Sequence, residues 1–190
     1  MLKSRIIIIS SASGGGKTTL INRLLEKENS IKLAVTATSR LPREGEVNGI
    51  HYHFFSKDKF KNMIDNGEFA EHAHVHGNYY GVPMESLNGP LRENKSVILN
   101  IDVQGMKTIL EKSGKENVVT IFLMAPDLKI WEERLRNRGT DSEEEINLRL
   151  KEGLKEMEQR NLYDHVVVND DLEQAVEDVL SILRKEKVIE

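Results

Sequence analysis

The chain has 190 residues, of which 38% are hydrophobic and 31% are charged, a composition typical of one globular domain. It contains no cysteine, which excludes disulfides and thiolate metal sites and favours a reducing compartment, so we expect a cytoplasmic protein. The early apolar run at residues 6–9 is too short to span a membrane. A net charge of −4, from 27 basic and 31 acidic residues, argues against a protein that binds long nucleic acids, because such proteins need a basic surface.

Apolar runs alternate with helix-like stretches along most of the chain. Four consecutive isoleucines at residues 6–9 are typical of a strand buried on both faces. Further apolar runs at 97–101, 118–124 and 165–168 are separated by helix-like stretches, among them 127–138 and 142–161. This alternation predicts an α/β fold with a parallel core sheet between two layers of helices.

The pattern changes between about residues 33 and 90. Residues 51–55 alternate in polarity, 57–66 have helical character, and 69–80 are strand-like, while Gly89-Pro90 is typical of a loop. We interpret this segment as an inserted lobe of mixed α/β structure.

A glycine-rich segment follows the first predicted strand and approximates the phosphate-binding motif G-x-x-x-x-G-K-[ST], with Ser11 in place of the first glycine. Glycines allow backbone N–H groups to face phosphate oxygens, Lys17 supplies a positive charge, and the Thr18 hydroxyl can bind Mg²⁺. A chance glycine-rich turn is the alternative, but the position between a buried strand and a helix favours phosphate binding. The candidate phosphate-binding residues are Ser11, Ala12, Ser13, Gly14, Gly15, Gly16, Lys17, Thr18 and Thr19.

Two arginines, Arg40 and Arg43, lie on either side of Pro42. Guanidinium groups present planar paired donors and keep their charge, which suits them to a phosphate dianion. The alternative is a solvated loop in which the arginines pair with Glu44 or Glu46.

Several motifs that occur in one order along the chain together resemble the guanylate kinase family. They are the segment 11–19, Thr38-Ser39-Arg40-x-Pro42-Arg43-x-Gly45-Glu46, Gly49-x-x-Tyr52, Phe69-x-Glu71, Gly77-x-x-Tyr80-Gly81, Ile101-Asp102-x-Gln104-Gly105, Arg138-Gly139-Thr140 and Val168-Asn169-Asp170. The resemblance implies a P-loop kinase with ATP and GMP as substrates, Mg²⁺ as cofactor, and the reaction ATP + GMP = ADP + GDP. It also implies a core at about 1–32, 91–126 and 162–190, a monophosphate-binding lobe at 33–90, and a helical lid at 127–161.

The resemblance further assigns residues to the acceptor site. Arg40, Arg43, Tyr52 and Tyr80 would bind the acceptor phosphate, and Glu71 would accept hydrogen bonds from guanine N1 and N2. A buried carboxylate matches these paired donors and leaves adenine unsatisfied. Without the resemblance, Tyr52 and Tyr80 read as core aromatics and Glu71 as a solvated strand residue. The remaining acceptor-site candidates are Thr36, Glu46, Val82, Asn100 and Asp102.

Three of these candidates depart from the pattern of the family. Val82 replaces a threonine or serine whose hydroxyl is expected near guanine O6, Asn100 replaces an acid, and Thr36 stands where a serine is common. Asp102 follows a predicted strand and could orient the acceptor or a metal through water, with helix capping as the alternative.

The chemistry needs cations more than a base, because a nucleotide phosphate is already largely ionised at neutral pH. The candidate catalytic residues are therefore Lys17, Arg43, Arg138 and Arg149, the last two on the lid. Arg134 is a weaker candidate, and surface charge is the alternative for each lid arginine. Asn169 could contact adenine or serve as a turn residue.

Two other functions stay open at this stage: a P-loop kinase for another phosphorylated acceptor, and a non-catalytic interaction module of the guanylate kinase type. The histidines at positions 72, 74 and 76 read as the polar face of a strand rather than as a metal site. A small homo-oligomer is also left open.

Overall fold

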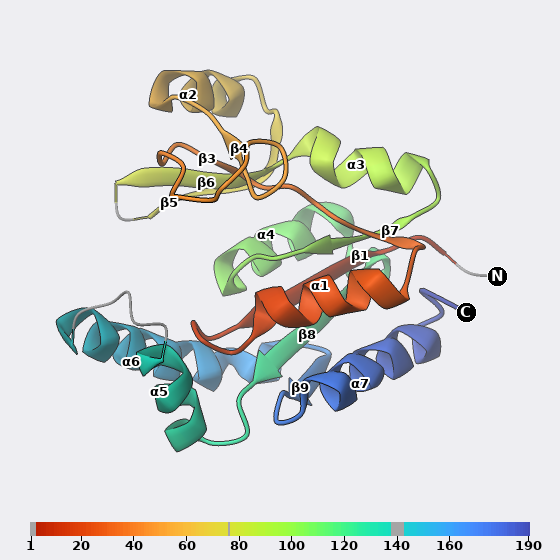
Figure 1. Ribbon diagram of the computed structural model, residues 1–190. Coiled ribbons are helices and arrows are strands. Elements are labelled where there is room, and N and C mark those ends of the chain that lie inside the picture. Colours follow the sequence, from red (N-terminus) through yellow and green to blue (C-terminus); the bar gives the residue numbers. More distant parts are fainter. Residues whose placement is uncertain (1–2, 76, 138–142) are drawn as a thin grey trace.

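The computed structural model describes residues 3–75, 77–137 and 143–190 (Figure 1). Its strands are β1 (Ile6–Ser11), β2 (Ile31–Leu33), β3 (Ala37–Thr38), β4 (His53–Phe54), β5 (Phe69–Val75), β6 (Asn78–Pro83), β7 (Ser96–Leu99), β8 (Val118–Met124) and β9 (His165–Val168). Its helices are α1 (Lys17–Lys27), α2 (Lys57–Asp65), α3 (Met84–Arg92), α4 (Val103–Ser113), α5 (Leu128–Arg136), α6 (Glu143–Glu158) and α7 (Leu172–Lys185), with short 3₁₀ turns at Lys115–Asn117 and Gln159–Leu162. Within these ranges no helix is long and apolar enough to cross a membrane.

The core is a parallel sheet of five strands in the order β2-β7-β1-β8-β9. The isoleucines of β1 divide between its two faces, as strand geometry requires. Ile7 and Ile9 pack with α1 and α7, whereas Ile6 and Ile8 pack in the cluster that includes residues of α4, α5 and α6. The predicted three-layer α/β fold is therefore confirmed.

The inserted segment carries a second sheet of four strands in the order β4-β3-β6-β5, which lies above the core in Figure 1. The stretch 69–80, which was expected to be strand-like, forms an antiparallel hairpin of β5 and β6. Gly77 has φ +77° at the turn, a conformation that ends an extended strand and that glycine adopts without strain.

The prediction of a loop at Gly89-Pro90 is wrong, because both residues lie in the last turn of α3. Pro90 has no backbone N–H and so removes one hydrogen bond from the helix. Because α3 ends two residues later, at Arg92, this loss affects only its last turn. The chain then leaves the helix through Asn94, which has φ +58°.

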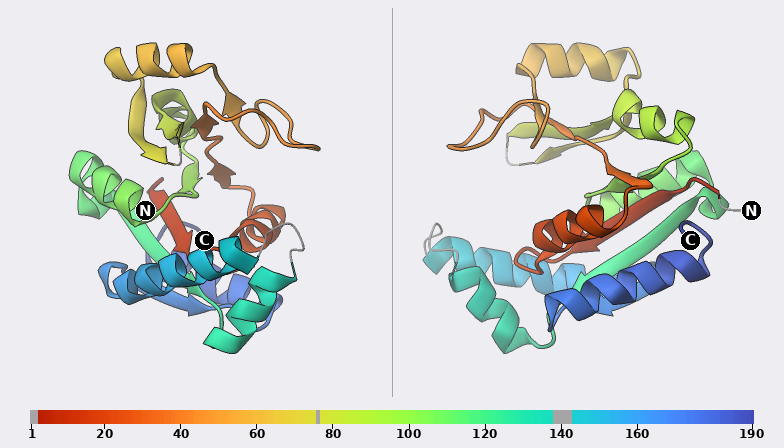
Figure 2. Two further views of the ribbon diagram at one scale, coloured as in Figure 1. Left: turned by 90° about the vertical axis from the view of Figure 1, so that its left-hand side faces the viewer. Right: turned by 45° about the vertical axis from the view of Figure 1, so that its right-hand side comes forward.

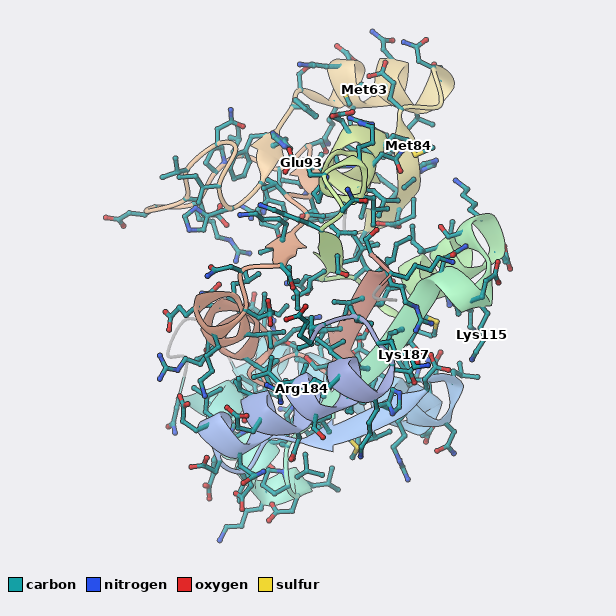
Figure 3. All side chains as sticks on the ribbon, turned by 90° about the vertical axis from the view of Figure 1, so that its right-hand side faces the viewer. Met63, Met84, Glu93, Lys115, Arg184 and Lys187 are labelled. Atoms are coloured by element: carbon teal, nitrogen blue, oxygen red, sulfur yellow. The ribbon has the colours of Figure 1, made fainter. Side chains whose placement is uncertain are left out.

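The carboxyl ends of the core strands lie on the left in Figure 1, between the second sheet above and the pair α5 and α6 below. The left view of Figure 2 faces this side of the molecule. Figure 3 shows the opposite side, with Glu93 before β7 in the upper half of the picture and Lys115 before β8, together with Arg184 and Lys187 at the end of α7, in the lower half. Open α/β sheets place their ligands at the carboxyl ends of the strands, so we look for a site there.

Candidate active site

The segment between β1 and α1 forms a phosphate cradle, by which we mean residues 11–19. These residues line a pocket of about 150 Å³. Four helices have a side-chain oxygen as N-terminal cap: α2 has Ser56, α4 has Asp102, α5 has Asp127 and α7 has Asp171. The N-cap of α1 is Gly16, which has no side chain that could cap the helix. The first N–H groups of α1 therefore face the pocket without a side-chain partner, as an anion site requires.

The cradle needs glycine where its backbone turns. Gly14 and Gly16 have φ of +89° and +86°, and a Cβ on Gly16 would lie 2.3 Å from Nδ2 of Asn169. That Nδ2 donates to the carbonyl of Gly15 at 3.0 Å. Asn169, expected to contact adenine or to serve as a turn residue, thus braces the cradle from the end of β9. Ser11 ends β1 without a positive φ, so its Cβ causes no backbone strain.

Lys17 lies half-buried at the start of α1. Burial lowers its pKa from 10.5 to about 8, and the carboxylates of Glu156 and Asp102 oppose this shift. A partly desolvated ammonium gains more from a bound polyanion than a fully hydrated one does, because the effective dielectric constant around it is lower. The arrangement is suited to binding the phosphates of a nucleotide.

A second pocket, of about 280 Å³, lies between the core and the second sheet, and we call it the acceptor pocket. Its lining includes six of the residues predicted for the acceptor site: Thr36, Tyr52, Glu71, Tyr80, Asn100 and Asp102. Four further lining residues were missed: Ala73, Val75, Gly81 and Ile101. A signal for two of them was present, because positions 71, 73 and 75 share one face of a strand.

Glu71 is buried in this pocket, with 8% of its surface exposed. The pairing of β5 with β6 shifts by one residue between Phe69 and Glu71, and such a bulge alters the direction of the neighbouring side chains. Burial raises the pKa of Glu71 to about 7, the Asp102 carboxylate adds to this rise, and Lys112 opposes it. The pocket therefore holds a buried carboxyl group that can accept hydrogen bonds when it is ionised.

Val82 and Asp102 were both predicted to belong to the acceptor site, and their positions relative to this pocket differ. Val82 is paired with Glu71 across the hairpin but is fully buried in the core cluster and does not line the pocket. Asp102 does line it, and its Oδ1 also accepts the N–H of Gly105 at 2.9 Å. Both interpretations of Asp102, helix cap and pocket residue, are compatible with its position.

The arginine loop is organised by Glu46. Its two carboxylate oxygens accept from Nη1 and Nη2 of Arg40 at 2.7 and 2.8 Å, and one of them also accepts the backbone N–H of Arg43 at 2.6 Å. The hydrogen bond from Arg40 lowers the pKa of Glu46 to about 2. The Arg40 guanidinium lies 5.3 Å from the ring centre of Tyr52, which in turn lies edge-on to Tyr80. The pairing with Glu46 thus holds Arg40 beside the aromatic residues of the acceptor pocket.

A third pocket, of about 440 Å³, shares one lining residue with each of the first two, and we call it the bridging pocket. It is lined by Ser13 of the cradle, by Tyr80 of the acceptor pocket, and by Arg43 and Arg149. Nη1 of Arg149 donates to Oγ of Ser13 at 3.0 Å. Sequence reasoning missed the other lining residues, which all belong to α6: Glu145, Leu148, Glu152, Gly153 and Glu156.

The arrangement of a phosphate cradle, a bridging pocket with arginines and a base-sized pocket with a carboxylate can now be compared with known proteins. The sequence matches the family described as guanylate kinase over residues 3–186. The chain belongs to the guanylate kinase family. Guanylate kinase from Neisseria gonorrhoeae is 48% identical over 181 residues, which cover 95% of this chain and 87% of that protein. Guanylate kinase from Rickettsia felis is 43% identical over 185 residues, which cover 97% and 95% of the two chains.

A solved structure supports the same assignment. The crystal structure of guanylate kinase from Anaplasma phagocytophilum superposes with a TM-score of 0.80 at 35% sequence identity, and the match covers all of this chain and 89% of that one. The family resemblance inferred from the motifs is therefore confirmed over nearly the whole length.

For a guanylate kinase, the arginines of α5 and α6 are of special interest. Arg138, a predicted catalytic residue, lies outside the described residues. Arg134 donates from Nη1 to the carbonyl of Asn169 at 2.8 Å, so it contacts the same residue that braces the cradle. Arg149, which lies in α6, lines the bridging pocket.

The histidines of β5 that the structure describes are exposed and lie against aromatic rings, His72 near Phe69 and His74 near Tyr79. Within residues 3–75, 77–137 and 143–190 no group of three or more histidine, aspartate or glutamate side chains could hold a metal.

Proposed function

We propose that this guanylate kinase family member transfers the terminal phosphoryl group of ATP to GMP through the residues that line its three pockets. The observation that carries this proposal is that the pockets share lining residues: Ser13 lines both the cradle and the bridging pocket, and Tyr80 lines both the bridging and the acceptor pocket. A donor phosphate in the cradle and an acceptor phosphate near Tyr80 would then face one another across the bridging pocket. Such alignment of two reactants supplies much of the catalysis in phosphoryl transfer.

The chain supplies the charges that the transfer needs. Lys17 would bind the ATP phosphates, while Arg43 and Arg149 would stabilise the charge on the transferring group from the two sides of the bridging pocket. We also infer that Arg138 contributes from the lid, as the family motif implies. The acceptor phosphate acts as its own nucleophile, so the side chains need not remove a proton.

The cradle residues fit a magnesium ion that arrives with ATP. Thr18 is exposed in the first turn of α1, where its hydroxyl can join phosphate oxygens and waters as a hard oxygen ligand. Bound there, Mg²⁺ would neutralise phosphate charge during transfer.

In the acceptor pocket, the Glu71 carboxylate would accept the N1 and N2 hydrogens of guanine, with Asp102 and Thr36 nearby on the pocket wall. Adenine presents an acceptor at N1 and no amino group at C2, so it would leave the buried carboxylate unsatisfied. Arg40, Arg43, Tyr52 and Tyr80 would bind the phosphate of the same nucleotide, and Glu46 would keep the two arginines in place.

The function is tested by offering GMP, dGMP, AMP, UMP and CMP separately to the protein with Mg²⁺-ATP and measuring ADP formation. We expect GMP and dGMP to be phosphorylated with kcat/KM at least about 100-fold above that for AMP. Preference for a different acceptor would overturn the assignment of GMP, and no turnover with any of the five would favour a non-catalytic interaction module.

The conversion of Glu46 to glutamine tests the arginine loop. One amide oxygen cannot accept all three hydrogen bonds that the carboxylate receives, so Arg40 and Arg43 lose their common partner. We expect KM for GMP to rise about tenfold, with a much smaller change in KM for ATP, measured by steady-state kinetics. Glu44→Gln, an exposed acid of the same loop, is the matched control and should leave both values unchanged. An equal rise of both KM values in the Glu46 variant would contradict this role.

A further inference from the structure

The chain contains a single tryptophan, Trp131, which lies in α5 and is buried with 1% of its surface exposed. Its Nε1 donates to the backbone carbonyl of Ser13 at 2.7 Å. This hydrogen bond joins residues 118 positions apart and connects α5 directly to the phosphate cradle.

The indole ring is also enclosed by α6 and by the cradle. A Cβ on Gly153 of α6 would lie 2.4 Å from Cζ2 of Trp131 and 3.3 Å from Cβ of Ala12. A Cβ on Gly14 would lie 2.9 Å from Cδ2 of Leu135 and 3.5 Å from Nε1 of Trp131. The two glycines thus allow α5, α6 and the cradle to approach closely around one ring.

The position of the hydrogen bond matters because a peptide unit is planar. The carbonyl of Ser13 and the N–H of Gly14 belong to the same trans peptide and point in opposite directions. A bond that holds the carbonyl toward the indole therefore sets the direction of the Gly14 N–H. Gly14 lines the phosphate pocket and has φ +89°. Because glycine has wide conformational freedom, a hydrogen bond from another element helps to hold the Ser13–Gly14 peptide in one orientation.

The same residue receives a second contact from α6, since Arg149 donates to Oγ of Ser13. A displacement of α5 would therefore move the backbone of Ser13. A displacement of α6 would move its side chain. Ser13 is thus connected both to α5 and to α6, and α6 also lines the bridging pocket.

We propose that Trp131 is a positioning residue of the ATP site, which holds the Ser13–Gly14 peptide in the orientation that presents the Gly14 N–H to phosphate. The inference rests on the proposed function of the cradle as the ATP site. It also makes the indole a reporter of that site, because phosphate bound at the cradle changes the surroundings of a ring that is hydrogen-bonded to it.

The test compares Trp131→Phe, which keeps an aromatic ring but has no N–H donor, with Phe122→Leu as the control. Phe122 is equally buried in the same core cluster and packs against Tyr163, so its variant reproduces a loss of core packing. We expect Trp131→Phe to raise KM for ATP about five- to tenfold, the effect of one lost hydrogen bond, while KM for GMP changes less than about twofold. Phe122→Leu should lower the melting temperature and leave both KM values unchanged.

Unchanged KM for ATP in Trp131→Phe, or an equal rise for ATP and GMP, would overturn the proposal. A second measurement uses the wild-type protein and needs no variant: its tryptophan emission should change on titration with Mg²⁺-ADP and stay constant with GMP alone. If Trp131→Phe does not fold, the titration of the wild-type protein tests the proposal instead. Tryptophan emission that does not change when Mg²⁺-ADP is added would overturn it. Phosphorylation of GMP by the wild type is measured first, so failure of the proposed function is seen separately.

Discussion

Replacement of Lys17 by alanine is expected to lower kcat for GMP phosphorylation by at least about 100-fold, the scale of losing one group that stabilises transition-state charge. The ammonium lies in a partly desolvated position at the start of α1, where burial lowers its pKa to about 8. The group remains mostly charged at neutral pH, and no other lysine lines the cradle. Steady-state kinetics with Mg²⁺-ATP and GMP measure the loss.

Two controls separate this effect from misfolding. Lys27→Ala changes a lysine in the last turn of the same helix, which pairs with Glu173 and Glu177 at the surface, and should retain nearly full activity because such surface pairs contribute little. The melting temperature of the Lys17 variant should stay close to that of the wild type. Near-normal turnover by Lys17→Ala would refute the role of the cradle.

Conversion of Glu71 to glutamine is expected to lower kcat/KM for GMP by roughly 10²- to 10⁴-fold and to leave the slow reaction with AMP nearly unchanged. The amide has a single acceptor oxygen and adds a donor that meets the guanine amino group, so the paired hydrogen bonds cannot form. Activity with both nucleotides gives the selectivity directly. Glu68→Gln, an exposed acid that precedes the same strand, is the matched control. Retained preference for GMP in the Glu71 variant would show that another group reads the base.

The pH dependence distinguishes this role from a structural one. Burial raises the pKa of Glu71 to about 7, and only the carboxylate accepts both guanine hydrogens, so KM for GMP should rise about tenfold per pH unit below 7 and level off above 8. Glu71→Gln should abolish this dependence near pH 7. Titration of the GMP phosphate at lower pH affects both proteins equally and can therefore be subtracted.

The same pKa shift carries a stability consequence. A carboxyl group whose pKa is higher in the folded than in the unfolded protein stabilises the fold below its unfolded pKa, and this contribution is lost as the pH rises through the folded pKa. Between 4.5 and about 7 the shift corresponds to about 3 kcal/mol at most. Glu71→Gln should therefore raise the melting temperature relative to the wild type at pH 8 and not at pH 4. An acceptor group kept in a buried pocket is thus a cost in stability that serves binding.

Features with a local cause could be predicted from the sequence. The apolar runs at 118–124 and 165–168 are β8 and β9 with the same bounds. β8 is buried along nearly its whole length, as a continuous apolar run in a parallel sheet should be, whereas β9 is an edge strand that leaves Val166 and Val168 exposed. The cradle could be identified for a similar reason, because the glycines, lysine and threonine that form it all lie within nine consecutive positions. The hairpin of β5 and β6 also had a local signal, because Gly77 lies at its turn with a positive φ.

The candidate site needed more than local pattern. Motif order placed Glu71, Asp102 and the arginines in a nucleotide site, but it could not choose between a pairing of Arg40 with Glu44 or with Glu46, and it could not show that Val82 is fully buried beside the pocket it was expected to line. Side-chain partners of this kind depend on loop conformation and on a bulge in β5. Small differences in packing energy determine both of these features.

By itself, then, the sequence determined four strands of the core sheet (β1, β7, β8 and β9), the cradle and the family, because hydrophobic periodicity, glycine positions and ordered motifs are carried by neighbouring residues. Only the tertiary structure decided which distant residues meet: the burial of Glu71 next to Asp102, and the hydrogen bond from Trp131 to Ser13. The physical reason is that desolvation and hydrogen bonding depend on distances between elements, and these follow from packing of the whole core rather than from any one segment.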